Sequence, residues 1–396
     1  MNATLVIDQK MPPEKSDARW ATSALFLVDG IGFGVWAALL PSLQARLHLT
    51  HGLTSILLLG MVLGAFVAMP LTGKLIGRWG CPQVLRMVAP AYCAVLALPI
   101  LSPSFMVAIL AATLFGALKG ALDVAVNSQA VAVEQALARP IMATFQALWS
   151  VGGLVAAVAV SVALRGGFPP TAIAVAVSAV LLALAARTVS KLIDDPRRAM
   201  APSSGKFPLE SPLLLLGLLA FFALFIEGVM MDWSAIYAHE VGGAASWLAP
   251  VAYGVFCCAM ATGRFLGDGI LTRNGAPRVL RRSGVAAGIG LCLMIAWPVW
   301  PVTFLGLTLA GMGLANLVPI YLSAAGRLNG HGVGHGVAAV STLGYLGFLA
   351  GPPTVGGLSA WFGLRGALLF VVLFAVILGI AGPGMLSAAN RPVEAK

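Results

Sequence analysis

Residues 78–86 read Arg-Trp-Gly-Cys-Pro-Gln-Val-Leu-Arg, and residues 273–281 read Arg-Asn-Gly-Ala-Pro-Arg-Val-Leu-Arg. The two stretches lie 195 positions apart and share Arg, Gly, Pro, Val-Leu and Arg in register. Such a repeat indicates two copies of one unit. Because each copy lies between two long apolar stretches, the duplication predicts a membrane protein built from two halves, an arrangement common among transporters.

The composition is that of a polytopic membrane protein. Hydrophobic residues make up 59% of the 396 positions and charged residues 10%, which leaves too little polar surface for a water-soluble fold. A bilayer core about 30 Å thick needs roughly 20 apolar residues per helix. The chain therefore divides into twelve expected spans, which begin near residues 20, 52, 83, 103, 141, 170, 212, 246, 280, 301, 334 and 362.

One long polar stretch, residues 187–211, separates the first six spans from the last six. It contains Lys191, Asp194, Asp195 and Lys206. We therefore predict an all-α integral membrane protein with twelve transmembrane helices in two pseudo-symmetric six-helix bundles. The bundles are expected to cover residues 1–190 and 212–396, with residues 191–211 as a cytoplasmic linker.

The basic residues set the expected orientation of the chain. The formal net charge of +10 could suggest a nucleic-acid partner. With both termini in the cytoplasm, however, all but four of the 24 Lys and Arg residues fall in the termini, the inner loops or the inner helix ends. This distribution follows the positive-inside rule, so we expect no nucleic-acid binding. The four exceptions are Arg46, Lys119, Arg165 and Arg365.

Ionisable side chains inside the expected spans are the first candidates for function, because each costs roughly 2.5–3.5 kcal/mol on insertion scales. Asp29 lies in the first span and Glu227 in the seventh, and a glycine follows each acid. The first helix of each half thus carries an acid. We expect the two acids to face each other across a central cavity, an arrangement suited to binding protons or cations.

Lys119, Asp123 and Asn127 recur every four residues in the fourth span and form one polar helical face. Lys119 and Asp123 can form an ion pair, and apolar surroundings couple their protonation equilibria. Two interpretations stay open. The pair is a structural one that neutralises itself, or a substrate or proton competes for one of its members during transport.

Further polar and aromatic residues are candidates for binding a solute. Glu227 and Asp232 are five positions apart, about 140° around a helix, so we do not expect them to share one proton. Trp233 could form an aromatic wall for a sugar or another organic ring, or an interfacial anchor. The uncharged candidates in other spans are Gln146, Trp149 and Asn316. Their alternative role is hydrogen bonding between helices.

Charged residues near the inner helix ends are candidates for a conformational gate. Arg264 and Asp268 are four positions apart near the inner end of the eighth span, which favours a latch over a substrate site. The repeated phrases add Arg78, Arg86, Arg273 and Arg281. The sequence carries no phosphate-binding glycine loop and no serine-hydrolase or zinc-protease motif, so we expect neither an enzyme nor a metal site.

The chain resembles the major facilitator superfamily, whose loop between spans two and three reads Gly-x-Leu-x-Asp-Arg-x-Gly-Arg-Arg. Residues 73–80 read Gly-Lys-Leu-Ile-Gly-Arg-Trp-Gly, with Gly77 in place of the usual aspartate. Within the superfamily the chain looks most like the fucose-permease-like group and its YbjJ-type branch. The matching phrases are residues 123–134, Glu227-Gly228, residues 232–234 and residues 344–353.

This resemblance implies proton-coupled uptake, with acids on the first and fourth helices that fall on Asp29 and Asp123. A lysine one turn from Asp123 is a departure from a neutral-sugar permease and leaves room for an anionic substrate. The resemblance also implies a monomer in the bacterial inner membrane.

The sequence therefore predicts a secondary transporter of a small polar solute, such as a sugar, a sugar acid or a related metabolite. The proton gradient drives it, and no bound cofactor is expected. The expected proton-coupling residues are Asp29, Asp123 and Glu227. The expected solute-binding residues are Lys119, Asn127, Gln146, Trp149, Asp232, Trp233 and Asn316. The alternatives are a proton-driven drug or metabolite exporter and a non-transporting membrane sensor.

Overall fold

A computed structural model of the chain describes residues 13–137, 141–193, 211–327 and 332–389. The described residues are almost entirely helical and contain no strand. A short 3-10 helix, Val189–Lys191, follows α7. The α-helices in chain order are α1 Pro13–Arg46, α2 His51–Trp79, α3 Cys81–Val95, α4 Leu98–Leu101, α5 Phe105–Leu137, α6 Met142–Arg165, α7 Pro170–Thr188, α8 Ser211–Glu240, α9 Ala249–Asn274, α10 Ala276–Ala296, α11 Trp300–Leu314, α12 Leu317–Arg327, α13 Gly332–Ile380 and α14 Gly382–Ala389.

Eleven helical segments of the described part are long and apolar enough to cross a membrane. The last segment belongs to α13, whose backbone leaves the helical conformation at Gly363, with φ 66° and ψ 164°. Glycine adopts such a positive φ at little cost because it has no Cβ. The parts of α13 before and after Gly363 are therefore two separate spans, which together with the others account for the twelve predicted. The predicted fold class is confirmed.

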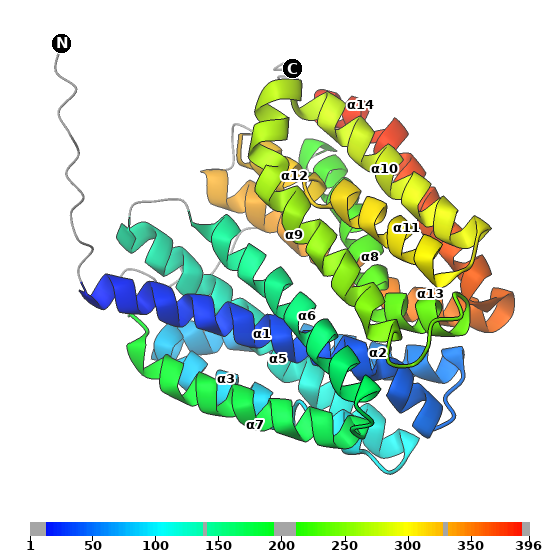
Figure 1. Ribbon diagram of the computed structural model, residues 1–396. Helices are drawn as coiled ribbons and strands as arrows, with labels where there is room; N and C mark the ends of the chain where they lie inside the picture. The colour runs from blue at the N-terminus through cyan, green and yellow to red at the C-terminus, as the bar shows by residue number, and fades with distance from the viewer. Residues whose placement is uncertain (1–12, 138–140, 194–210, 328–331, 390–396) are drawn as a thin grey trace.

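The helices form two bundles that lie side by side (Figure 1). Helices α1–α7 (blue to green) form the first half, and α8–α14 (yellow-green to red) form the second. In the first half α1 packs against α6 and α2 against α5, while in the second half α8 packs against α13 and α10 against α11. The halves meet where α6 contacts α9, α2 contacts α13 and α1 contacts α8. The predicted linker lies mostly outside the described residues, so its bounds stay a prediction.

The repeated nine-residue phrase forms the same turn in both halves. Gly80 ends α2 with φ 81° and ψ 155°, and Gly275 ends α9 with φ 74° and ψ 152°. Their backbone N–H groups donate to the carbonyls of Ile76 and Leu271, each at 2.9 Å. Glycine favours this positive φ, and the proline that follows it fits the first turn of the next helix. The duplication is thus visible in the backbone as well as in the sequence.

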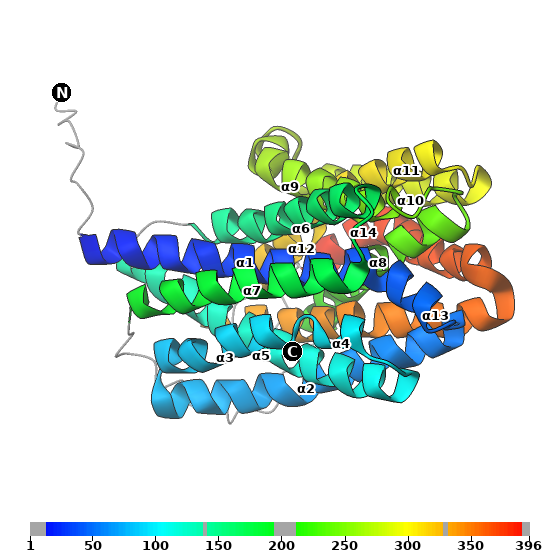
Figure 2. The ribbon, with the colours of Figure 1, turned by 60° about the horizontal axis from the view of Figure 1, so that its bottom comes forward.

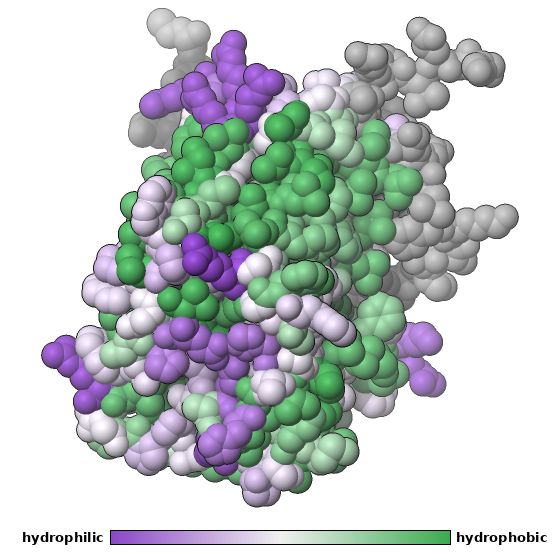
Figure 3. Space-filling view, turned by 90° about the vertical axis from the view of Figure 1, so that its right-hand side faces the viewer, coloured by the Kyte–Doolittle hydropathy of each residue, from purple (hydrophilic) through white to green (hydrophobic). Residues whose placement is uncertain are grey.

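Apolar side chains cover much of the outer surface of the bundle, as the broad green areas of Figure 3 show. Leu110, Val180 and Ile380 are 72%, 67% and 73% exposed. Most of the long helices run side by side along one common direction (Figure 2). Helices that satisfy their own backbone hydrogen bonds and expose apolar side chains suit a hydrocarbon environment.

The two halves are closed against each other at one end of the bundle. We call the end with the two repeated turns the terminal face, and the opposite end the distal face. At the distal face His51 Nε2 lies 2.6 Å from Glu240 Oε2. Ser161 Oγ donates to the Trp247 carbonyl at 2.5 Å, also across the halves. These contacts close the distal end.

Candidate functional site

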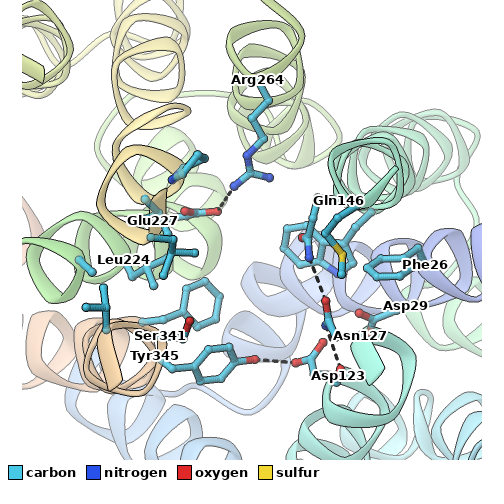
Figure 4. Close-up of a pocket in the computed structure, with 18 of the residues that line it drawn as sticks. Phe26, Asp29, Asp123, Asn127, Gln146, Leu224, Glu227, Arg264, Ser341 and Tyr345 are labelled. Carbon is cyan, nitrogen blue, oxygen red and sulfur yellow. Dashed lines mark hydrogen bonds and ion pairs between the residues drawn. The ribbon is translucent and has the colours of Figure 1, made fainter. Parts of the chain in front are cut away.

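A cavity of about 510 Å³ lies between the two halves (Figure 4). Its walls come from both bundles, and it extends to Met142 at the start of α6 and to Leu322 of α12. Both residues lie toward the terminal face, so the cavity extends to that face. Its volume is in the range of small-molecule sites. Nine of the residues singled out from the sequence line it: Asp29, Lys119, Asp123, Asn127, Gln146, Trp149, Glu227, Arg264 and Asn316.

The long apolar helices of the first half bring three charged groups together on one wall of the cavity. Lys119 Nζ donates to Asp123 Oδ1 at 2.5 Å and to Asp29 Oδ2 at 3.2 Å. Lys119 and Asp29 are buried, and the Asp123 side chain is 16% exposed. The predicted ion pair of α5 is therefore present. The structure adds Asp29 of α1 to it, so one ammonium group binds two carboxyl groups.

Glycine lets α1 and α6 approach closely enough to position this wall. A Cβ added at Gly30 would overlap the backbone carbonyl oxygen of Trp149. Small residues at such crossings allow helix backbones to touch. Lys119 Nζ, which binds Asp29 of α1, lies 5.7 Å from the centroid of the Trp149 ring of α6. The ammonium group is thus held by carboxylates and an aromatic ring together.

Asp123 also binds the other half of the molecule. The Tyr345 hydroxyl of α13 donates to Asp123 Oδ2 at 2.7 Å, as the dashed line in Figure 4 shows. Each oxygen of the Asp123 carboxylate thus has a partner, Lys119 in its own half and Tyr345 in the other. Sequence reasoning did not select Tyr345 as a site residue. The feature that could have pointed to Tyr345 is its hydroxyl group, which stands among glycine and leucine in the stretch Gly-Tyr-Leu-Gly at residues 344–347.

The opposite wall carries a second ion pair. Arg264 Nη2 donates to Glu227 Oε1 at 3.1 Å, and Arg264 Nη1 donates to Ser150 Oγ of the first half at 3.2 Å. Glu227 is buried, while the Arg264 side chain is 22% exposed in the cavity. Asp29 and Glu227 therefore lie on different walls of one cavity (Figure 4). Each is paired with a base of its own half, Asp29 with Lys119 and Glu227 with Arg264.

Arg264 lies near the end of the apolar span Ala249–Gly267, as expected, but not at the end of its helix. Helix α9 continues to Asn274, ten residues further, so Arg264 lies about 15 Å before the end of the helix. At this depth it reaches Glu227. The side chain of Asp268, its expected partner, lies outside the described residues. The gating role predicted for this pair stays untested, and the cavity position favours a role for Arg264 in the site.

Removing the Arg264 guanidinium should destabilise the protein, because it leaves the buried Glu227 carboxylate without a counter-charge. We expect Arg264→Met to lower the free energy of unfolding by about 1–3 kcal/mol, and Arg264→Met combined with Glu227→Gln to recover most of it. Thermal unfolding in detergent, analysed as a double-mutant cycle, measures the coupling. Equal destabilisation in the single and the double variant would contradict the pairing.

Amide side chains extend the polar surface of the cavity. Gln146 Nε2 donates to Asn127 Oδ1 at 3.0 Å, and Asn127 Nδ2 donates to the Asp123 carbonyl at 2.9 Å. On the other side, Asn316 Nδ2 donates to the Gly263 carbonyl at 2.9 Å. All three amides line the cavity as well as bonding to the protein. They can therefore exchange a protein partner for a polar solute.

The structure places Asp232 and Trp233 away from the cavity lining, which contradicts their expected role as solute-binding residues. Trp233 is fully buried, and its Nε1 donates to the Pro352 carbonyl at 3.0 Å. Asp232 is 4% exposed. The physical reason is the helical period. Asp232 lies about 140° around α8 and about 7.5 Å along it from Glu227, so it points elsewhere when Glu227 faces the cavity.

The four arginines of the repeated phrases lie at the terminal face. Arg78, Arg86, Arg273 and Arg281 are all exposed. Arg86 Nε donates to the Val189 carbonyl at 3.4 Å, a contact within the first half. Their position agrees with the inner helix ends expected from the sequence. Their role as a gate stays a prediction.

Comparison with known proteins agrees with the fold. A sequence model of the Major Facilitator Superfamily matches residues 22–328. The chain is 36% identical to an uncharacterized MFS-type transporter of Yersinia pestis over 362 residues, which are 89% of this chain and 93% of that protein.

Two solved structures share the arrangement of helices. One is a bacterial homolog of the human lysosomal transporter Spinster in an inward-facing, unoccupied conformation, with TM-score 0.76 and 14% identity over 97% of this chain and 100% of that chain. The other is the E. coli fucose:proton symporter FucP, with TM-score 0.60 and 17% identity over 94% of this chain and 98% of that chain. At these identities the likeness shows the fold alone.

Proposed function

The chain belongs to the major facilitator superfamily of transporters, and from this premise we propose that it is a proton-coupled secondary transporter of a small polar solute. Its two halves rock against each other and expose the central cavity alternately to the two sides of the bacterial inner membrane. The protein acts as a monomer. Membership of the fucose-permease-like group and its YbjJ-type branch stays a prediction.

The position of Asp123 is the observation that carries this proposal. Its carboxylate lines a cavity between the halves and binds Lys119 of one half and Tyr345 of the other. Protonation of such a carboxylate changes its charge and at the same time weakens the contact between the halves. Ionisable groups inside membrane spans are functional candidates because apolar surroundings make them costly to keep.

Protonation of Asp123 is the coupling step in this proposal. While it is ionised, Lys119 holds it in place and the Tyr345 hydroxyl ties it to the second half. A proton neutralises Asp123 and weakens both contacts, and Lys119 stays paired with Asp29. The solute then competes for the neighbouring amides of Asn127 and Gln146. Proton binding and solute binding thus act on the same contact between the halves.

The charges of the cavity favour a neutral polar solute. Among the described lining residues, Lys119 is held by Asp29 and Asp123, and Arg264 is held by Glu227. An anion would therefore compete with these carboxylates for each base. The amides, which can exchange their protein partners, and the aromatic rings can bind hydroxyl groups and the apolar face of a ring. A sugar has this combination of surfaces.

The orientation expected from the positive-inside rule makes the terminal face cytoplasmic. The cavity extends to that face, and the distal face is closed by contacts between the halves. The described conformation is then inward-facing. A solute and a proton taken up from outside would leave into the cytoplasm from this state.

Proteoliposomes test the proposal directly. The purified protein is reconstituted with a pH-sensitive dye inside, and L-fucose, D-glucose and D-glucuronate are added in turn as radiolabelled probes under an imposed proton gradient. We expect a neutral sugar to accumulate together with protons. Binding of a sugar without any flux would identify a sensor instead, and strictly outward flux would identify an exporter.

Replacement of Asp123 by asparagine separates coupling from binding. Asp123→Asn should abolish proton-driven accumulation of the transported sugar, while exchange of labelled for unlabelled sugar across the membrane continues. The matched control is Ser128→Ala, which removes a hydroxyl bonded to the Val124 carbonyl of the same helix. Full gradient-dependent accumulation by Asp123→Asn would refute the coupling role.

A further inference from the structure

Asp232 lies between the central cavity and the closed distal face. It follows Glu227, which lines the cavity, by five residues of α8, or about 7.5 Å. It precedes Glu240, which binds His51 at the distal face, by eight residues, or about 12 Å. Asp232 is 4% exposed and contributes nothing to the cavity lining. It therefore lies in a separate layer between the two.

Within the described residues this carboxyl group has no charged partner. Asp232 Oδ1 is buried without a hydrogen-bond partner, and the buried Trp36 indole N–H also has none. This indole of α1 is the polar group that faces the carboxyl group. Glu227, Asp29 and Asp123, in contrast, each have Lys or Arg within 3.2 Å. Asp232 is the exception among the buried acids that the structure describes.

The other titratable groups around Asp232 do not supply a positive charge at this position. Tyr253 of α9 faces it, and Asp29 of α1 lies on the cavity side. His51 of α2 packs on the neighbouring Trp233 with ring centroids 5.8 Å apart, and it binds Glu240. The described contact from α13 beside Asp232 is the Pro352 carbonyl, which accepts a hydrogen bond from the indole of the neighbouring Trp233.

A buried carboxylate without a partner costs several kcal/mol, whereas the neutral acid is far cheaper to bury. A metal cation would need several oxygen ligands around this carboxylate. The group that faces it is instead the N–H of Trp36, which is a donor and cannot coordinate a cation. A proton is thus the ligand that fits the site.

We propose that Asp232 is a second protonation site, separate from the central cavity, that carries a proton while the distal face is closed. When α8 and α1 separate, water reaches the carboxyl group and its proton leaves to the distal compartment, which restores the carboxylate. Closure of the distal face requires that a proton bind again. This inference rests on the proposed alternating access, and it adds a proton that does not compete with the solute.

Distance measurements between the halves test the proposal without any solute. Phe168→Cys and Trp297→Cys place spin labels on exposed turns of the first and second half at the distal face, in a variant whose five native cysteines are replaced. Electron-spin distances are recorded in lipid nanodiscs between pH 5 and pH 9. For one linked proton, the ratio of distal-open to distal-closed molecules should rise as the pH rises, by up to about tenfold per pH unit.

Asp232→Asn mimics the neutral acid, so this variant should keep the short, distal-closed distance at every pH. Asp232→Glu should retain the pH response, because it can still bind the proton. The matched control is Ser234→Ala, which alters another buried polar group of α8. His51→Gln should also retain the response, because the proposal does not assign the titration to the His51–Glu240 pair.

A pH response in Asp232→Asn equal to that of the unmodified protein would overturn the proposal. So would a response that disappears in His51→Gln but not in Asp232→Asn, or no response in the unmodified protein. Failure of the proposed function would give a different result. The proteoliposomes would then show no sugar flux, whereas the distance measurement would still report protonation of Asp232.

Discussion

Lys119→Met should abolish transport and lower the free energy of unfolding by roughly 3–5 kcal/mol. Lys119 Nζ lies 2.5 Å from Asp123 Oδ1 and 3.2 Å from Asp29 Oδ2. Methionine has a similar length, so the change removes the charge and leaves most of the packing. Two acids on neighbouring helices then share an apolar wall without a counter-charge. Thermal unfolding in detergent measures the loss of stability, and proteoliposomes measure the flux.

Neutralising the two acids shows whether the lost stability comes from their uncompensated charges. The triple variant Lys119→Met, Asp29→Asn and Asp123→Asn leaves no uncompensated charge in this wall. We expect it to recover most of the lost stability and to remain unable to accumulate sugar. If Lys119→Met were as stable as the unmodified protein, the three groups would not form the network that the distances indicate. If the triple variant accumulated sugar against its gradient, the network would be structural only.

The sequence predicted this network in part, because part of it is local. The spacing of Lys119 and Asp123 is a property of one helix, and the helical period places both on one face. The partnership with Asp29 depends on how α1 packs against α5, and no pattern within either helix determines it. Tyr345 was missed for the same reason. Its hydroxyl reaches Asp123 from the other half of the molecule.

Helix length explains the position of Arg264 on the other wall. Arg264 lies four residues before Asp268, and this spacing near the end of a span favoured a latch between the two. Helix α9 in fact continues to Asn274 and its repeated turn, so Arg264 lies deep enough to bind Glu227.

Trp233 was expected to line a cavity because it is aromatic and follows an acid. Its direction depends on which face of α8 meets α13, which is a tertiary property.

The fold was more predictable than the site, because it depends on long-range averages of the sequence. Hydropathy predicts the spans, and the repeated phrases at residues 78–86 and 273–281 indicate the duplication from the sequence alone. The positive φ of Gly363 then separates two spans that are otherwise continuous in α13. Errors of a few residues at helix ends do not change such a fold, but they change which side chains meet in the cavity.

Linking the two halves at the distal face should stop transport completely and reversibly. Alternating access requires the contacts at this face to open in every cycle. The Arg165 guanidinium of the first half lies 4.8 Å from the ring centroid of Trp247 in the second half. Arg165→Cys and Trp247→Cys, in a variant whose native cysteines are replaced, place two thiols across this contact. A bifunctional methanethiosulfonate reagent, which forms a disulfide with each thiol and is removed by reduction, then fixes the inward-facing conformation, and sugar uptake should fall to background.

A cross-link within one half distinguishes this loss of motion from chemical damage. Arg46 Nη2 donates to the Ile100 carbonyl at 2.6 Å, and both residues belong to the first half at the distal face. Arg46→Cys and Leu101→Cys are therefore the matched control, because both cysteine pairs replace one arginine. Cross-linking of this control pair should leave sugar uptake unchanged. Reduction should restore uptake in the pair that joins the halves. Transport that continued across the fixed Arg165–Trp247 contact would mean that the solute moves without opening of the distal face, and the rocking of two halves would then have to be abandoned for this protein.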